Sequence, residues 1–146
     1  MKWTATVLIG IALLTSFCIT GWSLSSSGAS ASNETLEARV FEMRTYYTHP
    51  GRLTHLHDRF RDHTNYLFVK HGMTLVGYWT PVEQKDTLVY ILAFPSREAR
   101  DKSFDAFRND PAWQAAFAES HKKAGGKIVK KVESQFLDPT DYSPIR

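Results

Sequence analysis

Residues 39–53, RVFEMRTYYTHPGRL, decide the fold because the spacing of their apolar residues changes period. Over 39–47 the residues alternate with the two-residue period of a strand. The two faces of this strand carry Phe41, Met43 and Thr45 on one side and Glu42, Arg44 and Tyr46 on the other. After the His-Pro-Gly at 49–51, apolar residues recur at helical spacing. The stretch therefore predicts a strand that leads directly into a helix.

The rest of the chain repeats this exchange between the two patterns. Gly72 ends the first helix, and Ser96 and Asp110-Pro111 are start signals for two later ones. The expected strands are 39–47, 73–80, 87–94 and 128–137. The expected helices are 50–70, 97–108 and 111–122. A β-α-β-β-α-β order predicts an α+β, ferredoxin-like fold. Its four-stranded antiparallel sheet has the fourth, first, third and second strands in that order, with the helices on one face.

The second face of this sheet has no helix to cover it. We assign to it a mixture of apolar and polar residues, namely Val76, Val129 and Leu137 with Glu42, Arg44, Tyr46, Tyr78 and Glu133. A half-apolar face of this size is unusual on a monomer. The sequence therefore predicts a homodimer in which two sheets close an α+β barrel around an internal cavity.

The first 31 residues have the organisation of a secretory signal. Lys2 precedes an uncharged run over 3–19, and small residues at 29–31 form a cleavage site before Ser32. An uncleaved membrane anchor is the alternative, because the run is at the lower limit for a span. We expect a signal peptide or N-terminal anchor over 1–31, a linker over 32–38 and one domain over 39–146. The predicted location is secreted or periplasmic, either free or membrane-anchored.

Composition excludes several kinds of site. The sole cysteine, Cys18, lies within the predicted signal, so the mature domain has no disulfide, thiol nucleophile or thiolate metal site. A net charge of +3 without a clustered basic face argues against nucleic acid as a partner. The histidines do not converge; His55 and His57, for example, point to different sides of their helix. No metal site is expected.

Four stretches resemble the NIPSNAP family. They are FEMRTYYTHPGRL from Phe41, HGMTLVGYWT from His71, FRNDPAWQAAFAES from Phe107 and KVESQFLDPTDYSPI from Lys131. The resemblance implies a dimeric α+β barrel, a superfamily that also holds cofactor-independent monooxygenases, haem-dependent chlorite-decomposing enzymes and muconolactone isomerases. It implies no settled activity, because fold membership is a weak guide to function.

The predicted ligand site centres on Arg44. Glu42 and Tyr46 share its strand face, and residues of neighbouring strands complete the set, namely Tyr78, Trp79, Tyr90 and Glu133. A guanidinium among carboxylates inside a barrel has two interpretations. One is an ion-pair network that fixes the register of the dimer, and the other is a binding site for an anion or enolate.

The function predicted from these features is that of an exported NIPSNAP-like dimer that binds a small, partly apolar ligand or a protein partner, without a cofactor. The alternative is a cofactor-independent monooxygenase or isomerase. In that case Arg44 or Tyr46 polarises a substrate carbonyl, and Glu42 or Glu133 takes a proton. A third hypothesis is a haem protein whose axial ligand is His63, His71 or His121.

Overall fold

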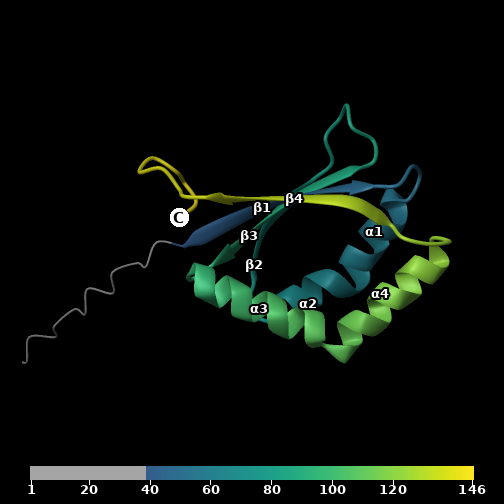
Figure 1. The fold of residues 1–146 in the computed structure, drawn as a ribbon. Helices are drawn as coiled ribbons and strands as arrows, with labels where there is room; N and C mark the ends of the chain where they lie inside the picture. Colours follow the sequence, from purple (N-terminus) through teal and green to yellow (C-terminus); the bar gives the residue numbers. More distant parts are fainter. Residues whose placement is uncertain (1–38) are drawn as a thin grey trace, which may run out of the picture. The chain divides into compact units, whose positions relative to one another are not determined.

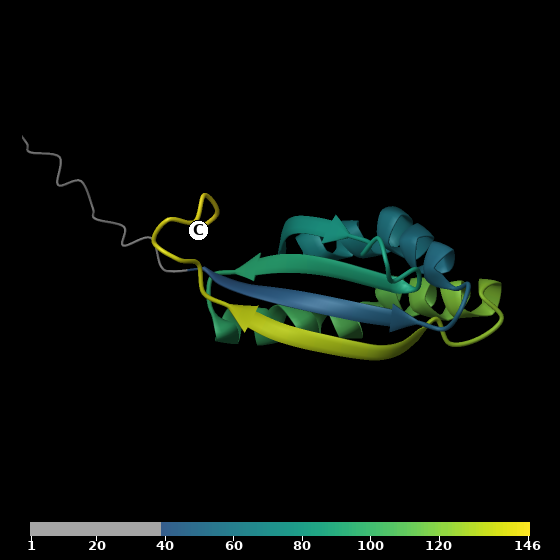
Figure 2. The same cartoon turned by 90° about the horizontal axis from the view of Figure 1, so that it is seen from above.

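The computed structural model describes residues 39–146, and the predicted signal peptide and linker lie outside these residues. The described part contains one antiparallel sheet in the order β2-β3-β1-β4. Its strands are β1 (Val40–Thr48), β2 (Thr74–Trp79), β3 (Thr87–Phe94) and β4 (Val129–Leu137). Both the ferredoxin-like strand order and the four strands are confirmed. Figure 1 shows the helices gathered on one face of this sheet, and Figure 2 shows the strands side by side above them.

The first helical segment contains a feature that the sequence pattern does not reveal. It consists of α1 (Leu53–Arg59), a π-helical turn η1 (Phe60–Thr64) and α2 (Asn65–Lys70). The backbone stays helical through both junctions, so η1 is a wide turn inside one helix. Such π-helical turns often mark functional positions. Gly72 then ends the helix in a left-handed conformation, with φ at 77°.

The other two helices, α3 (Arg97–Asn109) and α4 (Pro111–Lys123), begin where the sequence predicts. The Ser96 hydroxyl accepts a hydrogen bond from the Ala99 N–H at 3.1 Å. The Asp110 carboxylate accepts one from the Ala112 N–H at 2.8 Å. Each cap satisfies an N–H that the first turn of a helix leaves unpaired. A single residue separates the two helices. Figure 1 shows that α3 and α4 lie under different parts of the sheet.

The orientation of β1 is the reverse of the predicted one. Glu42, Arg44 and Tyr46 face the helices, and Glu42 is completely buried there. Val129 and Tyr78 also lie on the helix-covered face, since both pack against its core. Burial of a charge costs free energy unless the charge is paired. Here Arg100 of α3 supplies the pair, which makes the covered face the favourable one for Glu42.

The uncovered face of the sheet is consequently more apolar than predicted. Met43 of β1 lies between Ile91 and Gln135, its register partners on the adjacent strands. Trp79 lies over Gly77, where an added Cβ would stand only 2.6 Å from the indole ring. The tail over 138–146 lies along one end of this face and borders an open groove of about 360 Å³ beside Phe41 and neighbouring apolar side chains. Among the described helices, none is both long and apolar enough to cross a membrane.

Candidate functional site

A buried polar network occupies the centre of the helix-covered sheet face. The Glu42 carboxylate accepts hydrogen bonds from Arg100 at 2.7 and 2.8 Å and from Arg44 at 2.5 Å. The Ser134 hydroxyl of β4 donates to the same carboxylate at 2.5 Å. Burial alone would raise the pKa of Glu42, but the bonds from Arg100 and Ser134 and the charge of Arg44 bring it below its ordinary value. Glu42 is therefore an anion held by two cations and is a poor proton acceptor.

Most of the predicted site residues do lie together, although inside one subunit. Arg44 donates from Nε to the Tyr90 hydroxyl at 2.9 Å. The rings of Tyr46 and Tyr90 meet edge to face at 5.2 Å, and Tyr78 stacks on Tyr90 at 5.7 Å. Burial raises the pKa of Tyr78 to about 12, which keeps its hydroxyl protonated. The fold thus brings four tyrosine and arginine side chains into one cluster beneath the sheet.

Glu133 and Trp79 do not belong to this cluster. Glu133 was expected beside Arg44, but its register partner is Thr45, on the opposite face. Its carboxylate accepts a hydrogen bond from the Tyr47 hydroxyl at 2.9 Å and pairs with Lys131 at 2.6 Å. Trp79 is paired in register with Val89 and is 52% exposed. Side chains alternate between the two faces of a strand, so Ser134, and not its neighbour Glu133, lies on the same face as Arg44.

An apolar cavity of about 140 Å³ lies beside the network, between the sheet and the helices. Its walls come from β1, β4, the end of α1, the π-helical turn, α2, the end of α3 and α4. The lining residues are Tyr46, Arg59, Phe60, Thr64, Phe68, Phe107, Trp113, Phe117, Val129 and Val132. We call this space the ring cavity. Only one charged side chain lines it.

That charged side chain, Arg59, was not among the predicted site residues. It is the last residue of α1 and is only 3% exposed. Its guanidinium lies 5.3 Å from the ring centre of Trp113 and 5.1 Å from that of Phe117, and Nη1 donates to the Ser120 hydroxyl at 3.2 Å. Burial lowers the pKa of Arg59. One signal was available, because Arg59 follows Leu56 by three residues and so falls on the buried stripe of the helix.

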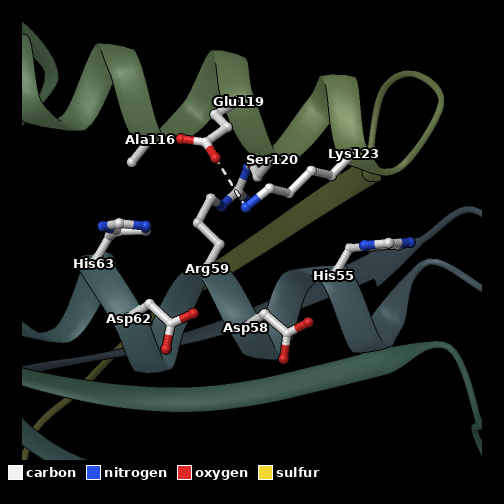
Figure 3. A pocket seen from close by; sticks show the side chains of 9 residues that line it. All are labelled: His55, Asp58, Arg59, Asp62, His63, Ala116, Glu119, Ser120 and Lys123. Carbon is white, nitrogen blue, oxygen red and sulfur yellow. Dashed lines mark hydrogen bonds and ion pairs between the residues drawn. The ribbon is translucent and has the colours of Figure 1, made fainter.

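A polar cleft lies on the other side of Arg59, between the first helix and α4. Figure 3 shows Arg59 extending toward Ser120, with Asp58 and Asp62 turned away from α4. Glu119 and Lys123, one turn apart on α4, form an ion pair at 2.8 Å on the α4 side of this cleft. Within residues 39–146, no three His, Cys, Asp or Glu side chains are arranged to hold a metal ion.

The three histidines considered as haem ligands lie apart from one another. His63 lines the polar cleft, whereas Nε2 of His71 lies 2.8 Å from the Asp110 carboxylate. The His121 ring is tilted against that of Phe117, with the ring centres 4.0 Å apart, near the start of β4. None of them lines the ring cavity.

The buried network predicts how the free energy of unfolding depends on pH. Because the pKa of Glu42 is lowered on folding, its charge stabilises the fold above the ordinary value of 4.5, and this contribution is lost as the pH falls through the folded pKa. A Glu42→Gln variant lacks this titration. We expect the gap in unfolding free energy between the native protein and the variant to narrow below pH 4.5. Urea unfolding at several pH values measures it, and a constant gap would contradict the assignment.

Comparison with known proteins identifies relatives of this fold and sequence. A protein-family model described as NIPSNAP matches residues 41–144. A Caenorhabditis elegans protein named as a NipSnap protein is 26% identical over 106 residues, or 73% of this chain. The chain spans only 19% of the length of that relative.

Two solved structures extend the comparison. A NIPSNAP family protein from Agrobacterium tumefaciens is 22% identical with a TM-score of 0.66, over 75% of this chain and 96% of that one. The cofactor-independent oxygenase SnoaB from Streptomyces nogalater is 13% identical with a TM-score of 0.51, over 73% and 98% of the two chains. At these identities the likeness establishes a shared fold.

Proposed function

The chain belongs to the NIPSNAP family, and from that premise we propose that its domain binds a small, ring-sized apolar molecule in the ring cavity. The observation that carries the proposal is the size and lining of this cavity, about 140 Å³ with six aromatic side chains around it. A dry apolar cavity of about 150 Å³ is large enough to bind benzene. A bound ring would exchange its contact with water for contact with these aromatic side chains, which favours binding in proportion to the apolar area buried.

The geometry supports binding more strongly than the oxygenase or isomerase alternative. SnoaB shares the fold and is a cofactor-independent oxygenase, but proton abstraction requires a base within reach of the substrate. Glu42 is held ionised by two arginines, and Glu133 lies on the other face of the sheet. The haem hypothesis receives less support, since the ring cavity is smaller than the roughly 300–1,000 Å³ of pockets for drug-sized ligands.

Benzene is the probe that tests this proposal. At ten times its dissociation constant, a ligand that binds only the folded state stabilises the protein by about 1.4 kcal/mol. We expect benzene to raise the melting temperature of the native chain. Val129→Phe, which places a ring in the cavity from the start of β4, should abolish that increase.

The matched control is Val82→Phe, because Val82 is 95% exposed in the turn between β2 and β3. This variant should respond to benzene as the native chain does. Equal responses from all three proteins, or no response from the native chain, would contradict the proposal.

We also propose that the protein is a homodimer joined through the uncovered sheet faces. An exposed apolar sheet face on a soluble domain marks an interaction surface, and this one carries Met43, Ile91 and the exposed Trp79. Tryptophan is enriched among residues that dominate binding energy at interfaces. A second copy is a suitable partner because a two-fold axis makes one patch self-complementary.

Export is a further proposal that the sequence alone supports. Residues 1–31 would direct the chain out of the cytoplasm, with cleavage before Ser32 or retention as a membrane tether. N-terminal sequencing of the protein from the cell envelope distinguishes these outcomes.

A further inference from the structure

We propose that the natural ligand of the ring cavity is a monocarboxylate with a ring-sized apolar body, which Arg59 binds through its guanidinium. This inference rests on the proposed function and adds the charge of the ligand and its route of entry. It is carried by a buried cation that lacks an anion, by the aromatic walls around that cation and by a basic entrance beside them.

Arg59 differs from the partly buried Arg44 and Arg100 in having no carboxylate partner among the residues that the structure describes. Arg44 and Arg100 both pair with Glu42, whereas Arg59 forms no ion pair with any residue that the structure describes. Its Nε is buried and makes no hydrogen bond within residues 39–146. Among the described residues, the Ser120 hydroxyl is the one side-chain acceptor of Arg59. Removing an ion from water is costly unless a counter-charge and hydrogen bonds replace the lost hydration.

The surroundings of the guanidinium define the rest of the ligand. Trp113 and Phe117 lie against it and also line the ring cavity. A ligand ring in the cavity would therefore contact these aromatic side chains and place a substituent at the guanidinium. A carboxylate matches the planar fork of arginine with two parallel hydrogen bonds. One cation in an apolar cavity favours a single negative charge over the two charges of a phosphate group.

The entrance that we assign lies between α4 and the start of β4. A second cavity of about 310 Å³ there shares three wall residues with the ring cavity, Phe117, Val129 and Val132. Phe117 is 40% exposed and Val132 is 44% exposed, so these side chains form a thin boundary that a rotamer change can open.

The rim of this entrance is basic. It carries His121, Lys127, Lys130 and Lys131. Burial and the nearby charges of Arg59, Lys127 and Arg52 lower the pKa of His121. A basic rim raises the local concentration of anions and speeds their association. The polar cleft on the opposite side of Arg59 has no such excess of positive charge, because Asp58, Asp62 and Glu119 line it together with Lys123.

The test compares three probes that share a phenyl ring: benzoate, its neutral near-isostere benzamide, and unsubstituted benzene. Titration calorimetry on the full chain should show that benzoate binds at least tenfold more tightly than benzamide. Arg59→Met should lower the affinity for benzoate by about 10–100-fold, the range for a lost hydrogen bond to a charged group. The same variant should bind benzene as the native chain does. The matched control is Arg108→Met, because Arg108 is exposed and paired with Asp105; this variant should bind all three probes as the native chain does.

The pKa of His121, measured by NMR, distinguishes a ligand-binding Arg59 from a purely structural one. A bound anion beside Arg59 should raise the pKa of His121, whereas bound benzene should leave it unchanged. The probe comparison on the native chain needs no variant, so it decides the inference even if Arg59→Met does not fold. Benzene binding with no preference for benzoate over benzamide would overturn this inference and keep the proposed function. No binding of any probe would overturn both.

Discussion

Glu42→Ala is expected to lower the free energy of unfolding by about 3–5 kcal/mol, the range for removal of one partner from a buried ion pair. The variant leaves Arg44 and Arg100 without their shared carboxylate, in a place where Glu42 is completely buried. It also removes the acceptor of the Ser134 hydroxyl. Urea unfolding followed by circular dichroism measures the loss.

Glu133→Ala is the matched control for Glu42→Ala. Glu133 lies one strand away on the uncovered face, where its pairs with Lys131 and Tyr47 are solvent-exposed and contribute little. A second comparison separates charge from packing. The triple variant Glu42→Leu, Arg44→Met, Arg100→Leu should recover most of the lost stability, because apolar groups of similar volume replace buried ion pairs well. A small loss in Glu42→Ala, or a triple variant less stable than Glu42→Ala, would contradict the network's assigned role.

Local signals predict the elements of this fold because they act over a few residues. Strand β3 spans Thr87–Phe94, the predicted bounds, since an apolar run ends at Pro95. The helix caps at Ser96 and Asp110 and the stop at Gly72 depend on hydrogen bonds within three residues or on one backbone angle. The antiparallel order of the strands then follows from the β-α-β-β-α-β sequence of elements.

The orientation of β1 depends on partners far along the chain, which is why the sequence misleads there. The alternation of Phe41 and Met43 with Glu42 and Arg44 identifies two faces but not which one the helices cover. The deciding hydrogen bond joins Glu42 to Arg100, 58 residues away. Without that pair, burial of a carboxylate is the unfavourable choice. A single sequence does not reveal which arginine forms the ion pair with Glu42.

Arg59 was missed for a related reason. Its spacing from Leu56 places it on the buried side of the helix, but a lone arginine there is usually interpreted as a surface residue whose charge reaches water. The structure instead buries it against Trp113 and Phe117, at the junction of α1 with the π-helical turn. The apolar walls from α4 and β4 are remote in sequence, so the cavity is a tertiary property. The proposed ligand site consequently lies within one subunit, whereas the sequence predicted a site between two.

Ile91→Glu is expected to convert the proposed homodimer to a monomer. Ile91 lies on a central strand of the uncovered face, with Met43 and Gly77 as its register partners. In a symmetric dimer the substitution buries two unpaired carboxylates, a cost of several kcal/mol. Since 1.4 kcal/mol corresponds to a factor of ten, the dissociation constant should rise by about a thousandfold. Sedimentation velocity over a range of protein concentrations measures it.

The control for Ile91→Glu is Val82→Glu, in the exposed turn between β2 and β3, which should remain a dimer. A native chain that sediments as a monomer at micromolar concentration would contradict the proposed dimer directly. The monomeric variant also separates the two proposals about this protein. The residues that line the ring cavity belong to the helices and to the helix-covered face of the sheet, away from the proposed dimer interface. The Ile91→Glu variant should therefore still bind benzene. If the pocket were instead formed between two sheets, dissociation of the dimer would abolish benzene binding.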